Sequence, residues 1–468
     1  MRKLIVIAAI IVITRFLPAC KSGIKTGSKD VSERKPNIIF ILTDDQRWDA
    51  VGYAGNPIIK TPNLDRLAHS GIWFRNAFVT TPISAASRAS LFTGLYERTH
   101  DFTFGKPPVD NRYMLESYPY LLRKAGYRTG FVGKFGVKVN EGIEDSMFST
   151  SVKTFWPYIK EIGGKKVHLA DINGNHAIDF IKSSKGQPFC LSLSFWSPHA
   201  DDGAKEQYFW PEYCDSLYQD VVIPVPETAD PAFFEALPEY LKTTMNRERW
   251  YWRFDTPEKY QKMVKGYYRM ISGVDSVIGR IQKTLREEGL ADKTVIIFMS
   301  DNGYFLGDRG YADKWLMYEQ SIKVPMFIYD PRQADSKQGR IIDEMVLNID
   351  ITPTILDLAG VDIPRRYQGR SLTGFYSGTP NNWRTSVFCE HRLENNPLLP
   401  KTECYRDDSW KFIRYEDNPG LIELYNYKED VNEARNLAKN KEYAAKIEFY
   451  RLKCDSAATR LMSERIEK

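Results

Sequence analysis

The chain has 468 residues, of which 43% are hydrophobic and 27% are charged, which is typical of a folded globular protein and not of a disordered one. The net charge of +5 is small for this length, and no stripe of basic residues is visible, so we expect no nucleic-acid partner.

The first 19 residues have the order of a secretory signal peptide. A basic dipeptide precedes an apolar run over residues 4–14, and small residues follow it. The run is too short to span a bilayer comfortably, so a membrane helix is not expected. Residues 17–20 (Leu-Pro-Ala-Cys) resemble a bacterial lipoprotein box, which implies lipidation of Cys20 and a periplasmic or outer-membrane location in a bacterium. Residues 20–35 are polar and would form a flexible tether.

The segments that follow alternate between two kinds of pattern. Short apolar runs bounded by Gly, Pro, Asp or Ser predict buried strands over residues 37–42, 129–132, 189–195, 294–299 and 324–329. Apolar residues at helical spacing predict helices over residues 62–70, 118–125, 175–182 and 260–288. This βαβ rhythm predicts an α/β fold, in which helices cover both faces of a large, mixed but mostly parallel sheet.

The C-terminal part has a different pattern. A helix is predicted over residues 351–359, and residues 369–382, rich in Gly, Ser, Pro and Asn, form the best candidate linker. Short strand-like runs and a charged final helix follow, which predicts a small α+β domain with an antiparallel sheet. We therefore expect a large α/β domain over residues 36–372 and a C-terminal subdomain over residues 383–468.

Cysteine usage does not indicate a disulfide framework. Beyond Cys20 an odd number of cysteines is scattered along the chain, without the C-x-x-C spacing of zinc or redox sites: Cys190, Cys214, Cys389, Cys404 and Cys454. We expect most of them to be packing residues. A bridge between Cys389 and Cys404 stays open.

Polar side chains follow four of the predicted strands. Asp44 and Asp45 follow the first, Lys134 the second, His199 the third, and Asp301-Asn302 the fourth. Ligands of open α/β sheets bind outside the carboxyl ends of the strands, so these residues are expected to converge.

The converging residues indicate two kinds of binding. Three carboxylates and an amide, without soft ligands, suit a hard divalent cation, with Ca²⁺ favoured over Mg²⁺. A cation also explains why three acids gather despite their mutual repulsion. Lys134, Lys314 and His199 would surround the metal with donors that bind an anionic ester and protonate its leaving oxygen. The pattern thus predicts hydrolysis of a sulfate or phosphate ester.

Residues 81–94 discriminate between these esters. They include Ser84, Ala86, Ser87-Arg88 and, further on, Thr93-Gly94. This spacing resembles the signature of the type I, formylglycine-dependent sulfatases of the alkaline phosphatase-like superfamily, and specifically a serine-type bacterial member. The resemblance continues through residues 61–68, 126–134, 197–199, 301–303 and 423–437, over nearly all of the mature chain.

The resemblance assigns roles to residues of this chain. It implies that Ser84 is oxidised by a serine-competent maturase to formylglycine (3-oxoalanine), whose hydrate both attacks sulfur and later releases sulfate. It places Ser84 with Asp44, Asp45, Asp301 and Asn302 around the metal. Arg88, one helical turn after Ser84, would hold the nucleophile's oxygen. Lys134, His199 and Lys314 would contact the sulfate.

The chain departs from the family pattern at two positions. Many members have Trp-His after the lysine, whereas Lys134 is followed by Phe135-Gly136, so a histidine that would touch the nucleophile is missing. Arg309 stands where a histidine is frequent in relatives.

The sequence leaves the substrate open. Export favours a sulfated carbohydrate, and the 13% of aromatic residues would allow stacking on sugar rings, although core packing explains them more simply. Candidate sugar-binding residues in predicted loops are His100, Arg309, His391 and Arg406. The alternatives are a phosphoester or phosphonate hydrolase of the same superfamily, and a noncatalytic binder of anionic glycans if Ser84 is never oxidised.

Overall fold

The computed structural model describes residues 35–333, 339–394 and 396–466. The predicted signal peptide, Cys20 and nearly all of the predicted tether lie outside these residues. From Lys35 onward the chain forms one compact unit. Among the described residues, no helix combines the length and the apolar character needed to cross a membrane.

An eight-stranded sheet forms the centre of this unit, with the strand order β13-β2-β12-β9-β1-β8-β4-β5. In that order the strands are Arg340–Ile342, Ile72–Phe74, Met326–Tyr329, Thr294–Ser300, Asn37–Thr43, Phe189–Ser194, Arg128–Gly133 and Thr150–Lys153. The strands β9, β1, β8, β4 and β5 are parallel to one another, whereas β12 runs antiparallel to both of its neighbours. The predicted large, mixed but mostly parallel sheet is confirmed.

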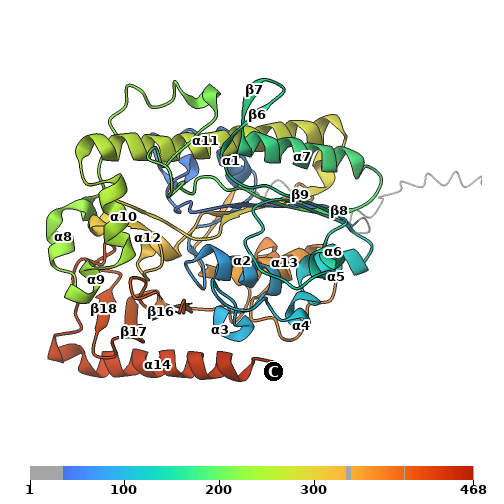
Figure 1. Cartoon of the computed structure of the whole chain (residues 1–468). Helices are drawn as coiled ribbons and strands as arrows, with labels where there is room; N and C mark the ends of the chain where they lie inside the picture. The colour runs from blue at the N-terminus through green and yellow to red at the C-terminus, as the bar shows by residue number, and fades with distance from the viewer. Residues whose placement is uncertain (1–34, 334–338, 395, 467–468) are drawn as a thin grey trace, which may run out of the picture. The chain divides into compact units, whose positions relative to one another are not determined.

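Helices cover both faces of the sheet (Figure 1). One face carries α1 (Pro62–His69), α7 (Leu169–Ser183) and α11 (Pro257–Glu287). The other carries α2 (Ser84–Thr93), α5 (Tyr118–Lys124), α6 (Ile143–Met147) and α13 (Ile351–Leu358). The remaining helices are α3 (Glu97–His100), α4 (Asn111–Met114), α8 (Pro231–Glu235), α9 (Glu239–Lys242), α10 (Met245–Arg253), α12 (Glu319–Ile322) and α14 (Ala444–Ser463).

The central strand β1 shows why this layering forms. Its alternate residues point to opposite faces, so Ile38, Phe40 and Leu42 pack in the cluster that contains α2, α5 and α13. Ile39 and Ile41 pack in the cluster that contains α1, α7 and α11. A strand buried on both faces reads as a continuous apolar run, which is the pattern from which it was predicted.

A second sheet lies in the C-terminal part, with the antiparallel order β15-β16-β17-β18. Its strands are Ser386–His391, Thr402–Asp407, Trp410–Tyr415 and Ile422–Asn426, and the final helix α14 packs with it. Two-stranded pairs complete the fold: β3 (Ala77–Phe78) with β14 (Val346–Leu347), β6 (Ile159–Ile162) with β7 (Lys165–His168), and β10 (Phe305–Leu306) with β11 (Ala312–Asp313).

In the C-terminal part, the structure bears on the predicted linker and on one cysteine pair. The segment predicted as a linker packs on the main core through Leu372 and Phe375, both fully buried. Cys389 and Cys404 lie directly opposite each other in the β15–β16 register, yet both are free and buried, as are the other three described cysteines. Packing is therefore the role of these thiols, and the bridge left open by the sequence is not formed.

Candidate active site

The carboxyl ends of β1, β4, β8 and β9 bring the predicted polar residues to one edge of the sheet. These four strands are parallel neighbours, so the residues that follow them converge as expected. Gly133 makes the close approach at the end of β4 possible, because a Cβ there would lie 1.8 Å from the carbonyl oxygen of Ser194. The amide of the next residue, Lys134, donates to this same oxygen at 2.9 Å.

The acidic residues form the centre of the site. Asp44, Asp45 and Asp301 are fully buried. The backbone N–H of Asp45 donates to Oδ1 of Asp301 at 3.2 Å, and Nδ2 of Asn302 donates to Oδ1 of Asp45 at 2.7 Å. Burial and repulsion from Asp44 raise the pKa of Asp301 to about 6. Three acids this close need positive charge around them.

Arg88 supplies part of that charge. Its Nε donates to Oδ2 of Asp301 at 2.8 Å, and its Nη2 donates to Oδ2 of Asp44 at 3.2 Å. Its Nη1 donates to the carbonyl oxygen of Lys134 at 2.8 Å and to the hydroxyl of Ser194. The guanidinium is thus held by several partners and links the ends of four strands, β1, β4, β8 and β9.

Two lysines contact different carboxylates of the cluster. Lys134 forms an ion pair with Oδ2 of Asp44, and Nζ of Lys314 lies 2.6 Å from Oδ2 of Asp45. Burial raises the pKa of Asp44, but attraction to Lys134 and to the neighbouring cations outweighs it and leaves that pKa well below its usual range. Burial lowers the pKa of Lys314, but Asp45 and Asp313 more than reverse this.

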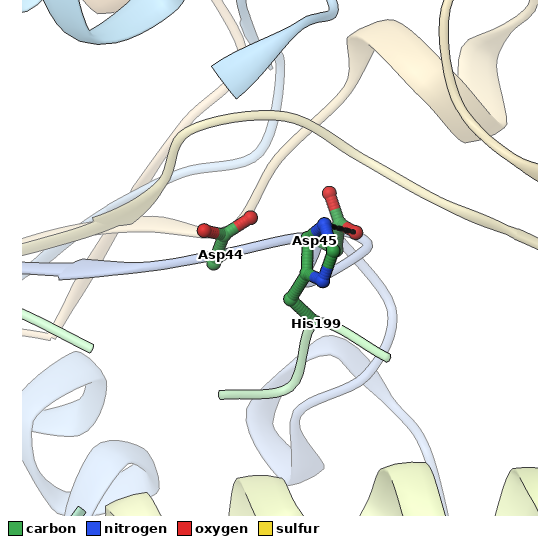
Figure 2. Close-up of side chains that lie close together, drawn as sticks. All are labelled: Asp44, Asp45 and His199. Atoms are coloured by element: carbon green, nitrogen blue, oxygen red, sulfur yellow. Dashed lines mark ion pairs between the residues drawn. The ribbon is translucent and has the colours of Figure 1, made fainter. Parts of the chain in front are cut away.

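His199 completes the ring of donors (Figure 2). Its Nδ1–H donates to the carbonyl oxygen of Ala200 at 2.6 Å, so Nε2 faces Oδ2 of Asp45 at 3.7 Å. Burial, together with repulsion from Lys314, lowers the pKa of His199. A neutral ring with a proton on Nδ1 presents a lone pair toward Asp45, and at 3.7 Å, beyond hydrogen-bond distance, the two groups could share a cation.

Ser84 opens α2, a helix whose ten residues are all buried. Its Oγ donates to Oδ1 of Asp44 at 3.2 Å and lies 3.4 Å from Oδ1 of Asn302. Gly94, in the left-handed conformation, ends the helix. The structure therefore brings Ser84 into the acidic cluster, one turn from Arg88, as the sequence predicts.

Gly136 gives a physical reason for the departure from the family pattern. A Cβ at this position would lie 2.7 Å from Cδ of Arg88, and the backbone φ of +70° is one that L side chains rarely adopt. A histidine could not stand at residue 136 without displacing Arg88.

The donor set fits a divalent cation. Asp44, Asp45 and His199 each offer a ligand atom, and these atoms lie within 4.8 Å of one another. Asn302 turns its amide nitrogen to Asp45 and its oxygen to Ser84, so that oxygen stays available as a ligand. Buried carboxylate and amide oxygens are the ligands that Ca²⁺ and Mg²⁺ prefer.

The four sugar-binding candidates are not brought to this cluster by any contact among the described residues. The prediction that all four lie in loops is wrong for three of them. His100 is in α3, His391 in β15 and Arg406 in β16, while Arg309 lies in a short 3-10 turn. All four are buried and bonded within the protein, with Arg406 paired to Glu319 at 2.8 Å and His100 bonded to Ser90 at 3.0 Å. Burial of polar side chains with fixed partners indicates structural roles for them.

Sequence reasoning missed a buried network beside Lys314. Asp313 accepts from Arg249 at 2.7 Å and from Arg253 at 2.8 Å, and both arginines also pair with Asp202. The residues on either side of Lys314, Asp313 and Trp315, have φ values of +71° and +79°. Such strained backbone persists only where its surroundings fix it. The spacing of two arginines four residues apart, on one helical face, is the signal from which the network could have been found.

Comparison with known proteins finds similar proteins and two family models that together match residues 36–455. The family model described as Sulfatase matches residues 36–361, and the one described as N-sulphoglucosamine sulphohydrolase, C-terminal, matches residues 307–455. An N-acetylglucosamine-6-O-sulfatase of Bacteroides thetaiotaomicron is 28% identical and aligns with 88% of this chain and 84% of its own length.

Two solved structures share the fold. One, in complex with its substrate D-glucosamine-2-N,6-O-disulfate, has a TM-score of 0.77 at 24% identity, over 92% of this chain and 99% of its own. A phosphonate monoester hydrolase of Agrobacterium radiobacter has a TM-score of 0.74 at 22% identity, over 91% of this chain and 96% of its own.

Proposed function

Because the chain belongs to the sulfatase family and is a sulfuric ester hydrolase, we propose that it removes sulfate from a sulfated carbohydrate, with Ser84, oxidised to formylglycine, as its nucleophile. The observation that carries this proposal is the position of Ser84. Its Oγ lies 3.2 Å from Asp44 and 3.4 Å from Asn302, inside a buried cluster that also holds two lysines, an arginine and a histidine.

The proposed metal ligands are the side-chain oxygens of Asp44, Asp45, Asp301 and Asn302, with residue 84 as a fifth ligand. We favour Ca²⁺ over Mg²⁺, because an all-oxygen set of this number suits the larger ion. When bound, the cation would polarise the sulfate ester and stabilise the charge that develops on it.

The remaining roles belong to side chains already in place. Arg88 orients the carboxylates of Asp44 and Asp301 through two charge-assisted hydrogen bonds. Lys134 and Lys314, which pair with Asp44 and Asp45, would bind the sulfate oxygens. His199, with its Nδ1–H fixed by Ala200, would protonate the leaving oxygen from Nε2 after Nε2 has taken up a proton.

Oxidation of Ser84 requires a partner enzyme. A serine that attacked sulfur would remain as a stable sulfate ester, whereas the hydrated aldehyde can return to the carbonyl and release sulfate. We therefore propose that a serine-competent formylglycine-generating maturase modifies the chain, which is exported and, if Cys20 is lipidated, anchored to a bacterial membrane by its lipid.

A glycan is favoured as the substrate by the relatives. The aligned Bacteroides protein is named for sulfate at position 6 of N-acetylglucosamine. Its 28% identity to this chain supports the class of substrate, a sulfated sugar, and not the position of the sulfate.

Mass spectrometry of the peptide that spans Ser84, from protein made in its native host, tests the modification. We expect a loss of two hydrogens and an aldehyde that reacts with hydrazides. An unmodified Ser84 in that host would contradict the proposal and favour a noncatalytic glycan binder. The matched control is Ser84→Ala, whose peptide cannot carry the aldehyde.

Initial rates on aryl sulfate and aryl phosphate separate the sulfatase from the phosphoester or phosphonate hydrolase that shares this fold. We expect a clear preference for sulfate, and loss of activity in Ser84→Ala. A clear preference for phosphate would overturn the proposal. A panel of position-defined sulfated monosaccharides then identifies the sugar.

A further inference from the structure

Two large aromatic side chains lie exposed on the segment that follows β5. Phe155 is 60% exposed and Trp156 is 38% exposed. Burying rings of this size stabilises a protein, so adjacent exposed rings next to a binding site indicate a surface that a ligand covers.

The segment is held rigidly against the loop that carries His199. Nε1 of Trp196 donates to the carbonyl oxygen of Thr154 at 2.7 Å. On the other side, the hydroxyl of Tyr158 donates to the carbonyl oxygens of His199 at 2.6 Å and of Trp196 at 3.0 Å. Because hydrogen bonds fix both of its flanks, the exposed indole is held in place before any ligand arrives.

The exposed ring of Trp156 lies close to residues of the acidic cluster. The ring of Trp156 lies 4.8 Å from that of Trp196 and 5.7 Å from that of His199. Nζ of Lys134 lies 4.8 Å from the ring of Trp196. His199 and Lys134 contact Asp45 and Asp44. The ring of Trp196 therefore lies between the indole of Trp156 and Lys134, one of the two lysines proposed to bind the sulfate.

We propose that Trp156 forms a stacking platform for the pyranose ring that bears the scissile sulfate. This inference rests on the proposed function and narrows it to sulfated pyranosides. A pyranose ring presents a face of C–H groups, which pack on an indole, while its sulfate reaches the lysines. The rigid platform would fix the distance between that face and the reacting ester.

One large cavity near this segment has a charge that does not suit a sulfated ligand. Its volume is about 1060 Å³, and its lining includes His168 and Phe209, which both stack on Tyr158. Four carboxylates and three basic side chains line it, so its charge does not favour a sulfated sugar.

Kinetics of Trp156→Ala on the best sulfated monosaccharide test the platform. We expect KM to rise about tenfold, the size expected for losing part of the burial of one aromatic ring. The inhibition constant of inorganic sulfate, which contacts the cations alone, should stay unchanged. Trp156→Phe should retain most of the affinity. Phe449→Ala, which removes a ring that is 51% exposed on α14, is the matched control.

An unchanged KM in Trp156→Ala would overturn the platform, and so would an equal rise in the KM and in the inhibition constant of sulfate. The second result would mean that the substitution disturbs His199 instead of removing a sugar contact. In both cases the sulfatase activity of the unaltered protein would stand.

Binding to Ser84→Ala protein, which lacks the nucleophile, separates the platform from the proposed function. Saturation-transfer NMR with the same monosaccharides should show contacts to the ring C–H groups that disappear in Ser84→Ala/Trp156→Ala. If these contacts appear but the unaltered protein hydrolyses no sulfated sugar, the platform stands and the proposed function fails. If no monosaccharide of the panel binds, the platform is refuted.

Discussion

Substitution of Gly136 by alanine tests whether this residue makes room for Arg88. The added Cβ would lie 2.7 Å from Cδ of Arg88, whereas ordinary contact begins at 3.4 Å, so the two atoms must separate by about 0.7 Å. The guanidinium cannot yield freely, because it bonds to Asp44, Asp301 and Ser194.

Two costs add in this variant. A φ of +70° costs a non-glycine residue roughly 1–2 kcal/mol. Overpacking of a filled site costs roughly 1–3 kcal/mol more. We therefore expect Gly136→Ala to lower the free energy of unfolding by about 3 kcal/mol. Displacement of Arg88 moves the carboxylates that it orients, and misplacement by this amount is expected to reduce kcat/KM roughly 10- to 100-fold.

Urea unfolding measures the loss of stability. The loss of activity is measured as kcat/KM on an aryl sulfate, divided by the fraction of protein that carries formylglycine. Gly142→Ala is the matched control, because Gly142 has a φ of +78° and no atom within 4 Å of the added Cβ. It should lose only the backbone cost, about 1 kcal/mol, and keep full activity. If Gly136→Ala behaves like Gly142→Ala in both measurements, the proposed role of Gly136 is refuted.

Three further outcomes are expected. Asp313→Asn weakens the buried network that holds the strained loop of Lys314, so we expect KM for the sulfate ester to rise. The circular dichroism spectrum should stay unchanged. An unchanged KM would contradict a positioning role of Asp313. Burial raises the pKa of Asp275 to about 6, so the native state holds a proton that the unfolded state releases above 3.8. The stability difference between the unaltered protein and Asp275→Asn should therefore fall by about 2 kcal/mol as the pH rises from 4 to 6, and a constant difference refutes this sign. Lys411→Met removes a fully buried ammonium that pairs with two buried glutamates, and urea unfolding should show a loss of about 3–5 kcal/mol; a neutral effect would show that the pairs only offset their desolvation.

The main sheet and the site at its edge could be predicted because each rests on local patterns. Continuous apolar runs identify strands buried on both faces, and the parallel arrangement then places Asp44, Lys134, His199 and Asp301 at one edge. The distances between these side chains follow from the strand register, which the sequence patterns do not contain.

The C-terminal sheet was harder to predict for a physical reason. The strand β16 carries Glu403 and Arg406 where a predicted strand would show apolar residues. These charges can be buried because each has a partner of opposite charge: Arg406 pairs with Glu319, and Glu403 pairs with Arg98. Both partners lie far away in the sequence. A buried ion pair between distant segments leaves no local signal, so a buried arginine resembles a surface one.

The pairing of Glu319 with the C-terminal sheet also bears on how this protein can be divided. Glu319 lies five residues beyond Lys314, and Arg406 and Lys411 of β16 and β17 both bond to its Oε1 at 2.8 Å. A chain shortened to the α/β part would leave this carboxylate without its cations, next to the loop that presents Lys314. The two parts are therefore one unit for protein engineering: exchanging C-terminal regions between relatives would have to preserve these ion pairs or retune the active site with them.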